Sequence, residues 1–193
     1  MGVHAVFLVG FMASGKSSVG QELARRLDWD FVDLDARIES RERQTVPEIF
    51  RDRGETGFRL AETSALRDLL SEPLKRSRVV ALGGGAFVQE RNRELLRQWP
   101  SVFLEATVPE LWQRSLRDGG ERPLRENPEQ FAKLYAERLP FYRQASVVIE
   151  TTGKQLDSIC VEIEGALHLK GTPEDAGSGL SRVDTDLGTG ESH

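Results

Sequence analysis

The fold is decided by one stretch near the start of the chain, Gly10-Phe11-Met12-Ala13-Ser14-Gly15-Lys16-Ser17. It fits the pattern G-x-x-x-x-G-K-[ST] of the phosphate-binding P-loop. The apolar run Val6–Val9 before it predicts a buried strand, and Val19, Leu23 and Leu27 after it recur at helical spacing. The loop therefore lies where a strand leads into a helix, as a nucleotide site requires.

The chemistry of this loop predicts how it would hold a nucleotide. Its glycines let backbone N–H groups converge on an anion, and the first turn of the following helix adds unpaired N–H groups. Lys16 would reach the β- and γ-phosphates of a nucleoside triphosphate, and the Ser17 hydroxyl would bind Mg²⁺. The alternative is a glycine-rich turn without a ligand. The expected nucleotide-binding positions of the loop are Ala13, Ser14, Gly15, Lys16, Ser17 and Ser18.

Composition limits the classes of protein to which the chain can belong. Its 193 residues suit one domain with a tail, and 38% hydrophobic with 30% charged residues allows a core and a soluble surface. It has no run of 18 apolar residues, no secretory leader pattern and no basic stripe, so we expect neither a membrane nor a nucleic-acid partner. A single cysteine, Cys160, fits a reducing cytoplasm, and its apolar helical surroundings predict buried packing.

The end of the chain differs in composition from the rest. Residues 171–193 hold five acidic side chains and one basic side chain, and they are rich in Gly, Ser and Thr. Such a segment cannot bury enough apolar surface to fold. We therefore expect a domain over residues 1–168 followed by a disordered acidic tail over 169–193, and a monomer, since no apolar stripe is left over.

Short apolar segments alternate with amphipathic ones along the domain. This alternation indicates an α/β fold with a parallel sheet covered on both faces, and with ligands at the carboxyl ends of the strands. Residues 116–127 combine Gly119, Gly120 and Pro123 with charged side chains, which is typical of a mobile loop, so we expect a lid there. The expected strands are Val3–Val9, Phe31–Asp33, Val79–Leu82, Val102–Glu105 and Ser146–Glu150. The expected helices after the P-loop helix are Asp35–Arg43, Pro47–Arg53, Thr56–Leu70, Gln89–Gln98, Pro109–Arg114, Pro128–Tyr142 and Lys154–Leu167.

Two of these strands end in residues that can do chemistry. Alternation along an extended chain puts Asp33 and Asp35 on the same side. One carboxylate could hold Mg²⁺ through water while the other accepts a proton from an attacking hydroxyl, or Asp35 could merely cap the next helix. Gly83-Gly84-Gly85 would let the backbone approach a small ligand closely, or it could be a plain turn.

Six motifs then occur in one order: the P-loop, D-x-D, G-E-x-x-F-R-x-x-E, G-G-G, R-P-L and R-x-P-x-Y. As a set, from about Val3 to Leu167, they resemble the shikimate kinase family of small P-loop kinases. The resemblance implies a three-layer fold with a five-stranded parallel sheet in the order 2-3-1-4-5 and a mobile lid. It also implies transfer of the γ-phosphoryl group of ATP to the 3-hydroxyl of shikimate, with Mg²⁺, in aromatic amino-acid biosynthesis.

The resemblance further implies residue roles at the acceptor side of the site. Arg59 and Arg138 would grip the shikimate carboxylate. Asp35 would bind a substrate hydroxyl and act as the base, and Asp33 would help organise Mg²⁺. The other positions implied on this side are the glycines Gly83, Gly84 and Gly85 beside the substrate hydroxyls and the aromatics Phe50 and Phe58 along the pocket.

On the nucleotide side, the resemblance implies that Arg122 of the lid closes on the phosphates and that Arg114 stacks on adenine. Lys154 falls near a basic position at the other face of the base. Lys16, Asp35 and Arg122 would together form the catalytic set.

The chain departs from the family pattern at two positions of interest. Ala13 stands where Gly is commoner, and we expect little effect because this position is variable. Arg125 replaces a second Leu after R-P-L. The rival interpretations are another small-molecule P-loop kinase, such as a gluconate kinase, and a nucleotide-binding module that transfers nothing.

Overall fold

The computed structural model describes residues 3–73, 75–117 and 127–169. Most of the expected lid, with Arg122 and Arg125, and the acidic tail from residue 170 lie outside the described residues. Among the residues that are described, no helix is long and apolar enough to cross a membrane.

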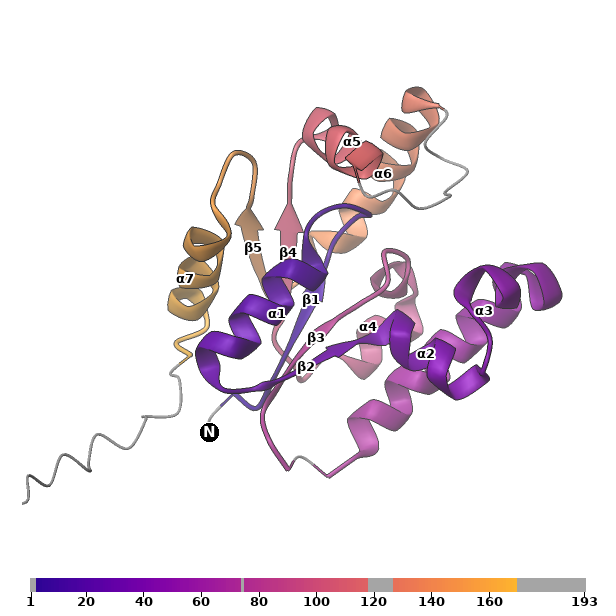
Figure 1. The fold of residues 1–193 in the computed structure, drawn as a ribbon, viewed down its shortest axis with the longest axis horizontal. Coiled ribbons are helices and arrows are strands. Elements are labelled where there is room, and N and C mark those ends of the chain that lie inside the picture. The colour runs from indigo at the N-terminus through magenta and orange to yellow at the C-terminus, as the bar shows by residue number, and fades with distance from the viewer. Residues whose placement is uncertain (1–2, 74, 118–126, 170–193) are drawn as a thin grey trace, which may run out of the picture.

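The centre of the fold is a sheet of five parallel strands in the order β2-β3-β1-β4-β5 (Figure 1). Both the α/β architecture and the strand order are confirmed. Each predicted strand begins and ends within two residues of the observed one. The strands are β1 (Ala5–Val9), β2 (Asp30–Asp33), β3 (Arg78–Ala81), β4 (Ser101–Glu105) and β5 (Val147–Glu150).

Helices connect the strands as expected, and their observed bounds lie within three residues of the predicted ones. The predicted helices Pro47–Arg53 and Thr56–Leu70 follow one another within α3, on either side of a kink at Gly54, which has non-helical dihedral angles (φ 66°, ψ −177°). That conformation is open to glycine and strained for other residues, so the kink depends on Gly54. The helices are α1 (Lys16–Leu27), α2 (Leu34–Glu42), α3 (Val46–Ser71), α4 (Glu90–Leu95), α5 (Val108–Arg117), α6 (Pro128–Tyr142) and α7 (Leu156–Ala166), with a 3₁₀ turn, η1, at Ala86–Val88.

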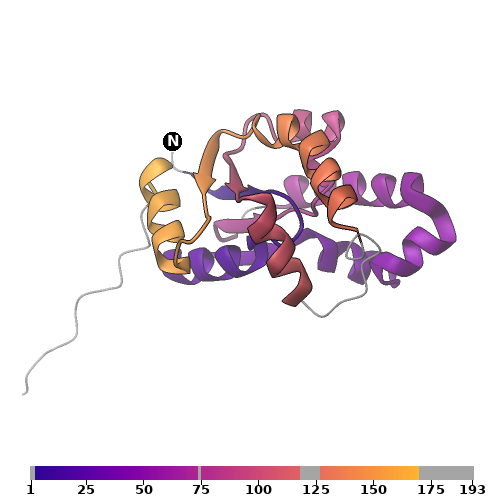
Figure 2. The same ribbon diagram turned by 90° about the horizontal axis from the view of Figure 1, so that it is seen from above.

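Alternating side chains of β1 divide the core into two parts, one on each face of the sheet. Val6 and Leu8 pack with α1 and α7, where Cys160 is fully buried as predicted. Phe7 and Val9 face the opposite way, into the larger cluster formed with α2, α3, α5 and α6. Figure 2 shows α1 and α7 together on one side of the sheet. Because helices cover both faces of the sheet, β1 is buried on both sides and is apolar at every position.

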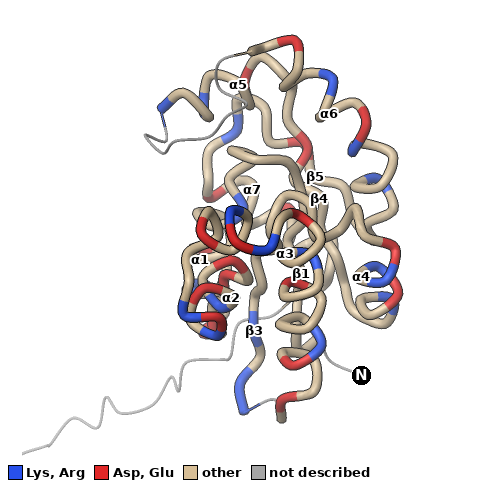
Figure 3. Tube along the Cα trace, turned by 90° about the vertical axis from the view of Figure 1, so that its right-hand side faces the viewer, with Lys and Arg blue, Asp and Glu red and all other residues tan. Residues whose placement is uncertain are grey.

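The register of the strands brings the functional loops together. β3 lies between β1 and β2, with Leu8 and Asp33 both paired to Ala81. The carboxyl ends of these three strands therefore meet at one edge of the sheet, where the P-loop, the start of α2 and the glycine corner follow. Charged residues of both signs are interspersed along α1, α2 and α3 (Figure 3).

Candidate active site

A large cavity of about 1510 Å³ opens at the carboxyl edge of the sheet. It brings together every site residue that was predicted from the sequence and that the structure describes. Those that line it are Ala13, Ser14, Gly15, Lys16, Ser17, Ser18, Asp33, Asp35, Phe50, Phe58, Arg59, Gly83, Gly84, Gly85, Arg114, Arg138 and Lys154. Arg122 lies outside the described residues.

The P-loop owes its shape to its first and last glycines. Gly10 has φ 153°, and a Cβ there would lie 2.7 Å from Ser14 Oγ and 3.0 Å from the Leu104 carbonyl oxygen. Gly15 adopts φ 89° and caps α1, with its carbonyl accepting from the Val19 amide at 2.8 Å. These two positions leave no room, or no favourable backbone conformation, for a side chain.

Ala13 is a point of strain in this loop. It adopts φ 61°, in the left-handed region, where a Cβ costs about 1–2 kcal/mol. A glycine at this position would be free of that cost. The motif allows any residue at this position, but the backbone conformation seen in the structure favours glycine there.

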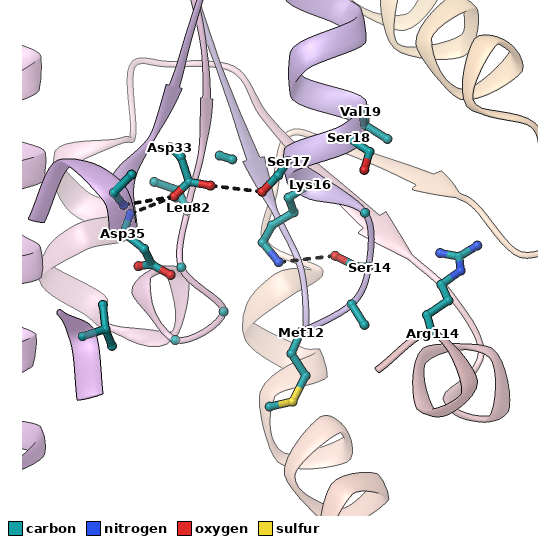
Figure 4. Close-up of a pocket in the computed structure, with 18 of the residues that line it drawn as sticks. Met12, Ser14, Lys16, Ser17, Ser18, Val19, Asp33, Asp35, Leu82 and Arg114 are labelled. Carbon is teal, nitrogen blue, oxygen red and sulfur yellow. Dashed lines mark hydrogen bonds between the residues drawn. The ribbon is translucent and has the colours of Figure 1, made fainter. Parts of the chain in front are cut away.

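The Lys16 ammonium group is held over the loop by the loop itself. It donates to the carbonyl oxygens of Gly10 at 3.1 Å and Phe11 at 2.8 Å, and it lies 3.5 Å from Ser14 Oγ (Figure 4). Its cationic end is thus placed at the mouth of the loop, where a phosphate group would meet it.

Asp33 connects the P-loop to the second strand. Its Oδ2 accepts from Ser17 Oγ at 3.0 Å, while its Oδ1 accepts from the amides of Asp35 at 3.0 Å and Ala36 at 3.3 Å. Asp33 is therefore the N-cap of α2, and the alternative in which Asp35 caps this helix is wrong. The expectation of an extended chain through both residues is also wrong, because β2 ends at Asp33 and Asp35 lies in the first turn of α2.

The Ser17 and Asp33 oxygens could hold a metal ion. Both are hard donors beside the phosphate loop, which Mg²⁺ prefers, and Mg²⁺ keeps several waters as its remaining ligands. Among the described residues no group of three or more His, Cys, Asp or Glu side chains is arranged to hold a metal. The donor set fits an ion bound mainly through water and phosphate.

The glycine corner is packed against charged side chains. A Cβ on Gly83 would lie 2.6 Å from Asp35 Oδ1 and 3.2 Å from Glu62 Oε1, and a Cβ on Gly85 would overlap Arg59 Nη2. The missing side chains are thus what allows two carboxylates and a guanidinium to reach the same small volume. A plain flexible turn would not require the absence of side chains at these positions.

Arg59 is oriented by Glu62, one turn further along α3. Its Nη1 donates to both carboxylate oxygens of Glu62, at 3.1 and 3.0 Å. The Glu62 side chain is fully buried, and burial raises its pKa to about 7, against the opposing attraction of Arg59. The guanidinium also lies over Phe58, whose ring stacks on Phe50 at 4.6 Å.

Arg138 approaches the corner from α6. Its Nη1 donates to the Gly84 carbonyl oxygen at 3.3 Å, and its Cζ lies 5.8 Å from the centre of the Phe11 ring. Tyr142, one turn on, donates its hydroxyl to the same carbonyl, and burial raises its pKa to about 12. Arg59 and Arg138 therefore contact one glycine corner from two different helices.

The other end of the cavity lies beyond the P-loop. Arg114 of α5 and Lys154, which precedes α7, line it together with Leu156 and Ile159. Lys154 Nζ is 2.7 Å from both carboxylate oxygens of Glu162. Figure 4 shows Arg114 on the opposite side of the P-loop from Asp33 and Asp35.

Sequence reasoning assigned no site role to three residues that belong to this constellation. Glu62 and Tyr142 were visible as the last letters of their motifs, but nothing in the pattern says that they hold Arg59 and the Gly84 carbonyl oxygen. Arg117, at the end of α5, lines the cavity and had no signal in the sequence beyond its charge.

Comparison with known proteins gives the family of the chain. The shikimate kinase family model matches residues 12–168. The shikimate kinase of Geobacter metallireducens is 44% identical over 170 residues, covering 86% of this chain and 93% of that protein. A shikimate kinase of Thermus thermophilus is 42% identical over 162 residues, covering 82% and 86%. The structure of shikimate kinase from Acinetobacter baumannii in complex with shikimate superposes with a TM-score of 0.78 at 38% identity, covering 86% and 94%. The chain belongs to the shikimate kinase family.

Proposed function

We propose that this protein transfers the γ-phosphoryl group of ATP to the 3-hydroxyl of shikimate. The observation that carries the proposal is the pair Arg59 and Arg138 beside the glycine corner, facing the P-loop across one cavity. Two guanidinium groups at one point suit a carboxylate, which they can bind through paired hydrogen bonds. Shikimate is a carboxylic acid with ring hydroxyls, and it matches both this pair and the nearby Asp35.

The chain's own groups supply each part of the transfer. Lys16 and the P-loop amides would oppose the charge on the transferring phosphoryl group. The acceptor oxygen forms a bond to the γ-phosphorus as the bond from that phosphorus to the bridging oxygen breaks, which releases ADP. Asp35 would orient the hydroxyl and take its proton late in the transfer.

Ser17 and Asp33 are the residues that would hold Mg²⁺. When bound, the ion neutralises charge on the β- and γ-phosphate oxygens. The hydrogen bond between the two side chains places their oxygens 3.0 Å apart, close enough to share one water shell. Loss of Mg²⁺ on chelation should abolish transfer while leaving the fold intact.

An ADP-release assay with different acceptors tests the proposal. The purified protein with ATP and Mg²⁺ should form ADP rapidly with shikimate and slowly without it, and the product should be shikimate 3-phosphate. Turnover stimulated by gluconate instead would support the rival small-molecule kinase. Nucleotide binding without turnover on either acceptor would support the non-catalytic module.

We propose in addition that residues 1–168 form the catalytic domain and act as a monomer in the cytoplasm. This range is supported by the two core clusters and by the cavity, because every described cavity residue and every buried core residue lies within it. Size-exclusion chromatography with light scattering would give a mass near 21.6 kDa for the full chain.

A further inference from the structure

Glu110 makes contacts beside the cavity that no role assigned so far explains. It lies in the first turn of α5 and does not itself line the cavity. Its Oε1 accepts a hydrogen bond from Arg114 Nη2, and its Oε2 accepts from the backbone amide of Gly153 at 3.2 Å. Its side chain is one-quarter exposed, so water screens these contacts only in part. Glu110 therefore joins an arginine of the cavity wall to the loop between β5 and α7.

That loop is already tied to β4 and to Thr107, which precedes α5, by other hydrogen bonds. The Thr151 amide and hydroxyl both donate to the Glu105 carbonyl oxygen, at 2.8 and 3.0 Å. The Thr107 amide donates to Thr152 Oγ1 at 3.1 Å. Gly153, at φ 69°, is the point where the chain turns towards α7. Glu110 holds this turn and Arg114 at once, and Arg114 Nη2 is also 3.4 Å from the Thr151 carbonyl oxygen.

The position of the cavity end lined by Arg114 and Lys154 indicates which part of a nucleotide it would contact. Lys16 lies between Asp35 on one side and Arg114 on the other (Figure 4). The glycine corner contacts Asp35, Glu62 and Arg59, so this side is the one that would take the acceptor. A triphosphate held by the loop must extend its nucleoside to the remaining side. That side is lined by Arg114, Lys154 and the apolar side chains of Leu156 and Ile159, a combination suited to a flat base.

An unrestrained Arg114 would be a poor wall for that base. A free arginine side chain has several rotamers, and ordering it on binding costs affinity. Glu110 removes much of this cost in advance because its carboxylate fixes the guanidinium and because it does so from the rigid first turn of a helix.

We infer that Glu110 is a positioning residue for the nucleoside end of the site. It raises the affinity for adenine nucleotides by holding Arg114 and the Gly153 turn in place, without touching the nucleotide. This inference rests on the proposed function, since it needs a nucleotide in this cavity. A local helix-stabilising ion pair, the simpler interpretation of Glu110 and Arg114, would change stability and not nucleotide affinity.

Calorimetric titration with two ligands separates these interpretations. ADP and inorganic tripolyphosphate, each with Mg²⁺, both use the P-loop, but only ADP has a nucleoside. In Glu110→Ala we expect the Kd for ADP to rise about tenfold, and that for tripolyphosphate to stay within about twofold. Glu110→Gln keeps the volume and an acceptor oxygen, so it should recover part of the affinity.

The matched control is Glu22→Gln. Glu22 also pairs with an arginine within one helix, with its side chain 20% exposed, but it does not line the cavity. This variant should bind both ligands like the wild type. In an Arg114→Ala background, Glu110→Ala should weaken ADP binding by less than about threefold, because most of its effect passes through Arg114.

Three results would overturn the inference: unchanged ADP affinity in Glu110→Ala, equal weakening for both ligands, or full additivity with Arg114→Ala. A wild-type protein that binds neither ligand would contradict the proposed function instead. Shikimate-dependent turnover with unchanged ADP binding in Glu110→Ala would leave the proposed function standing and remove only the role of Glu110.

Discussion

Replacing Glu62 by glutamine should remove a pH dependence from the stability of the protein. The Glu62 side chain is fully buried, and its pKa rises in the fold from an ordinary 4.5 to about 7, because burial disfavours the charged form more than Arg59 favours it. A carboxyl with a raised folded pKa contributes stability at low pH that is lost as pH rises through that value. The amide side chain of the Glu62→Gln variant would be neutral at every pH.

The magnitude follows from proton linkage. With pKa values of 4.5 unfolded and about 7 folded, the contribution of this group falls by roughly 2–3 kcal/mol between pH 5 and pH 8. Asp35 and Arg138 also act on Glu62, but both are present in the wild type and in the variant. The difference in unfolding free energy between the two proteins should therefore change by that amount across the range.

Urea denaturation of the two proteins at pH 5, 6, 7 and 8 measures this difference. The wild-type midpoint should fall relative to that of Glu62→Gln by on the order of 1 M urea. Glu55→Gln is the matched control, because Glu55 contacts the same Arg59 at 3.3 Å with its side chain 69% exposed, so its difference from wild type should stay flat. A Glu62→Gln difference that is constant within about 0.5 kcal/mol would refute the reasoning from burial.

Three further changes test other parts of the site. Asp35→Asn should leave ADP affinity nearly unchanged and lower kcat by about 10²–10⁴-fold in the ADP-release assay, and near-wild-type turnover would contradict its role as proton acceptor. Arg138→Ala should raise the shikimate KM at least about tenfold with a small effect on the ATP KM, because it leaves the substrate carboxylate with one guanidinium, and an unchanged KM would mean that the acid binds elsewhere. Ala13→Gly should raise the unfolding free energy by about 0.5–1 kcal/mol, the relief at φ 61° less the entropy that glycine adds to the unfolded chain, and a calorimetric Tm at or below wild type would count against strain.

Local patterns were enough to predict the layers of this fold. The apolar runs that became β1, β3 and β4 are short, buried on both faces and bounded by turn residues, so their length and their flanking residues indicate strands. Helix extents were less predictable. The pattern over Gln89–Gln98 predicts one helix, yet α4 ends at Leu95 and the chain turns from Leu96 to Trp99 ahead of Pro100. A proline disfavours helix in the residue before it, but periodicity does not register that effect.

The D-x-D motif shows where sequence reasoning stopped. Both residues are aspartates near a strand end, and either could cap the next helix. The choice between them depends on where β2 stops pairing with β3, which happens at Asp33 and Ala81. Only the paired strands settle that point, so the division of tasks between Asp33 and Asp35 could not be predicted from the two letters alone.

The sequence by itself determined the class of chemistry. The P-loop needs its glycines, lysine and serine at fixed spacing in one short segment, with a strand before it and a helix after it. It also predicted which strand ends would carry the residues that bind the phosphoryl acceptor. Only the tertiary structure decided how residues of the site constrain one another: Ser17 against Asp33, Tyr142 against the Gly84 carbonyl oxygen, and Glu110 against Gly153. The physical reason is that burial and hydrogen-bond partners arise between elements distant along the chain, whereas a motif records only neighbours.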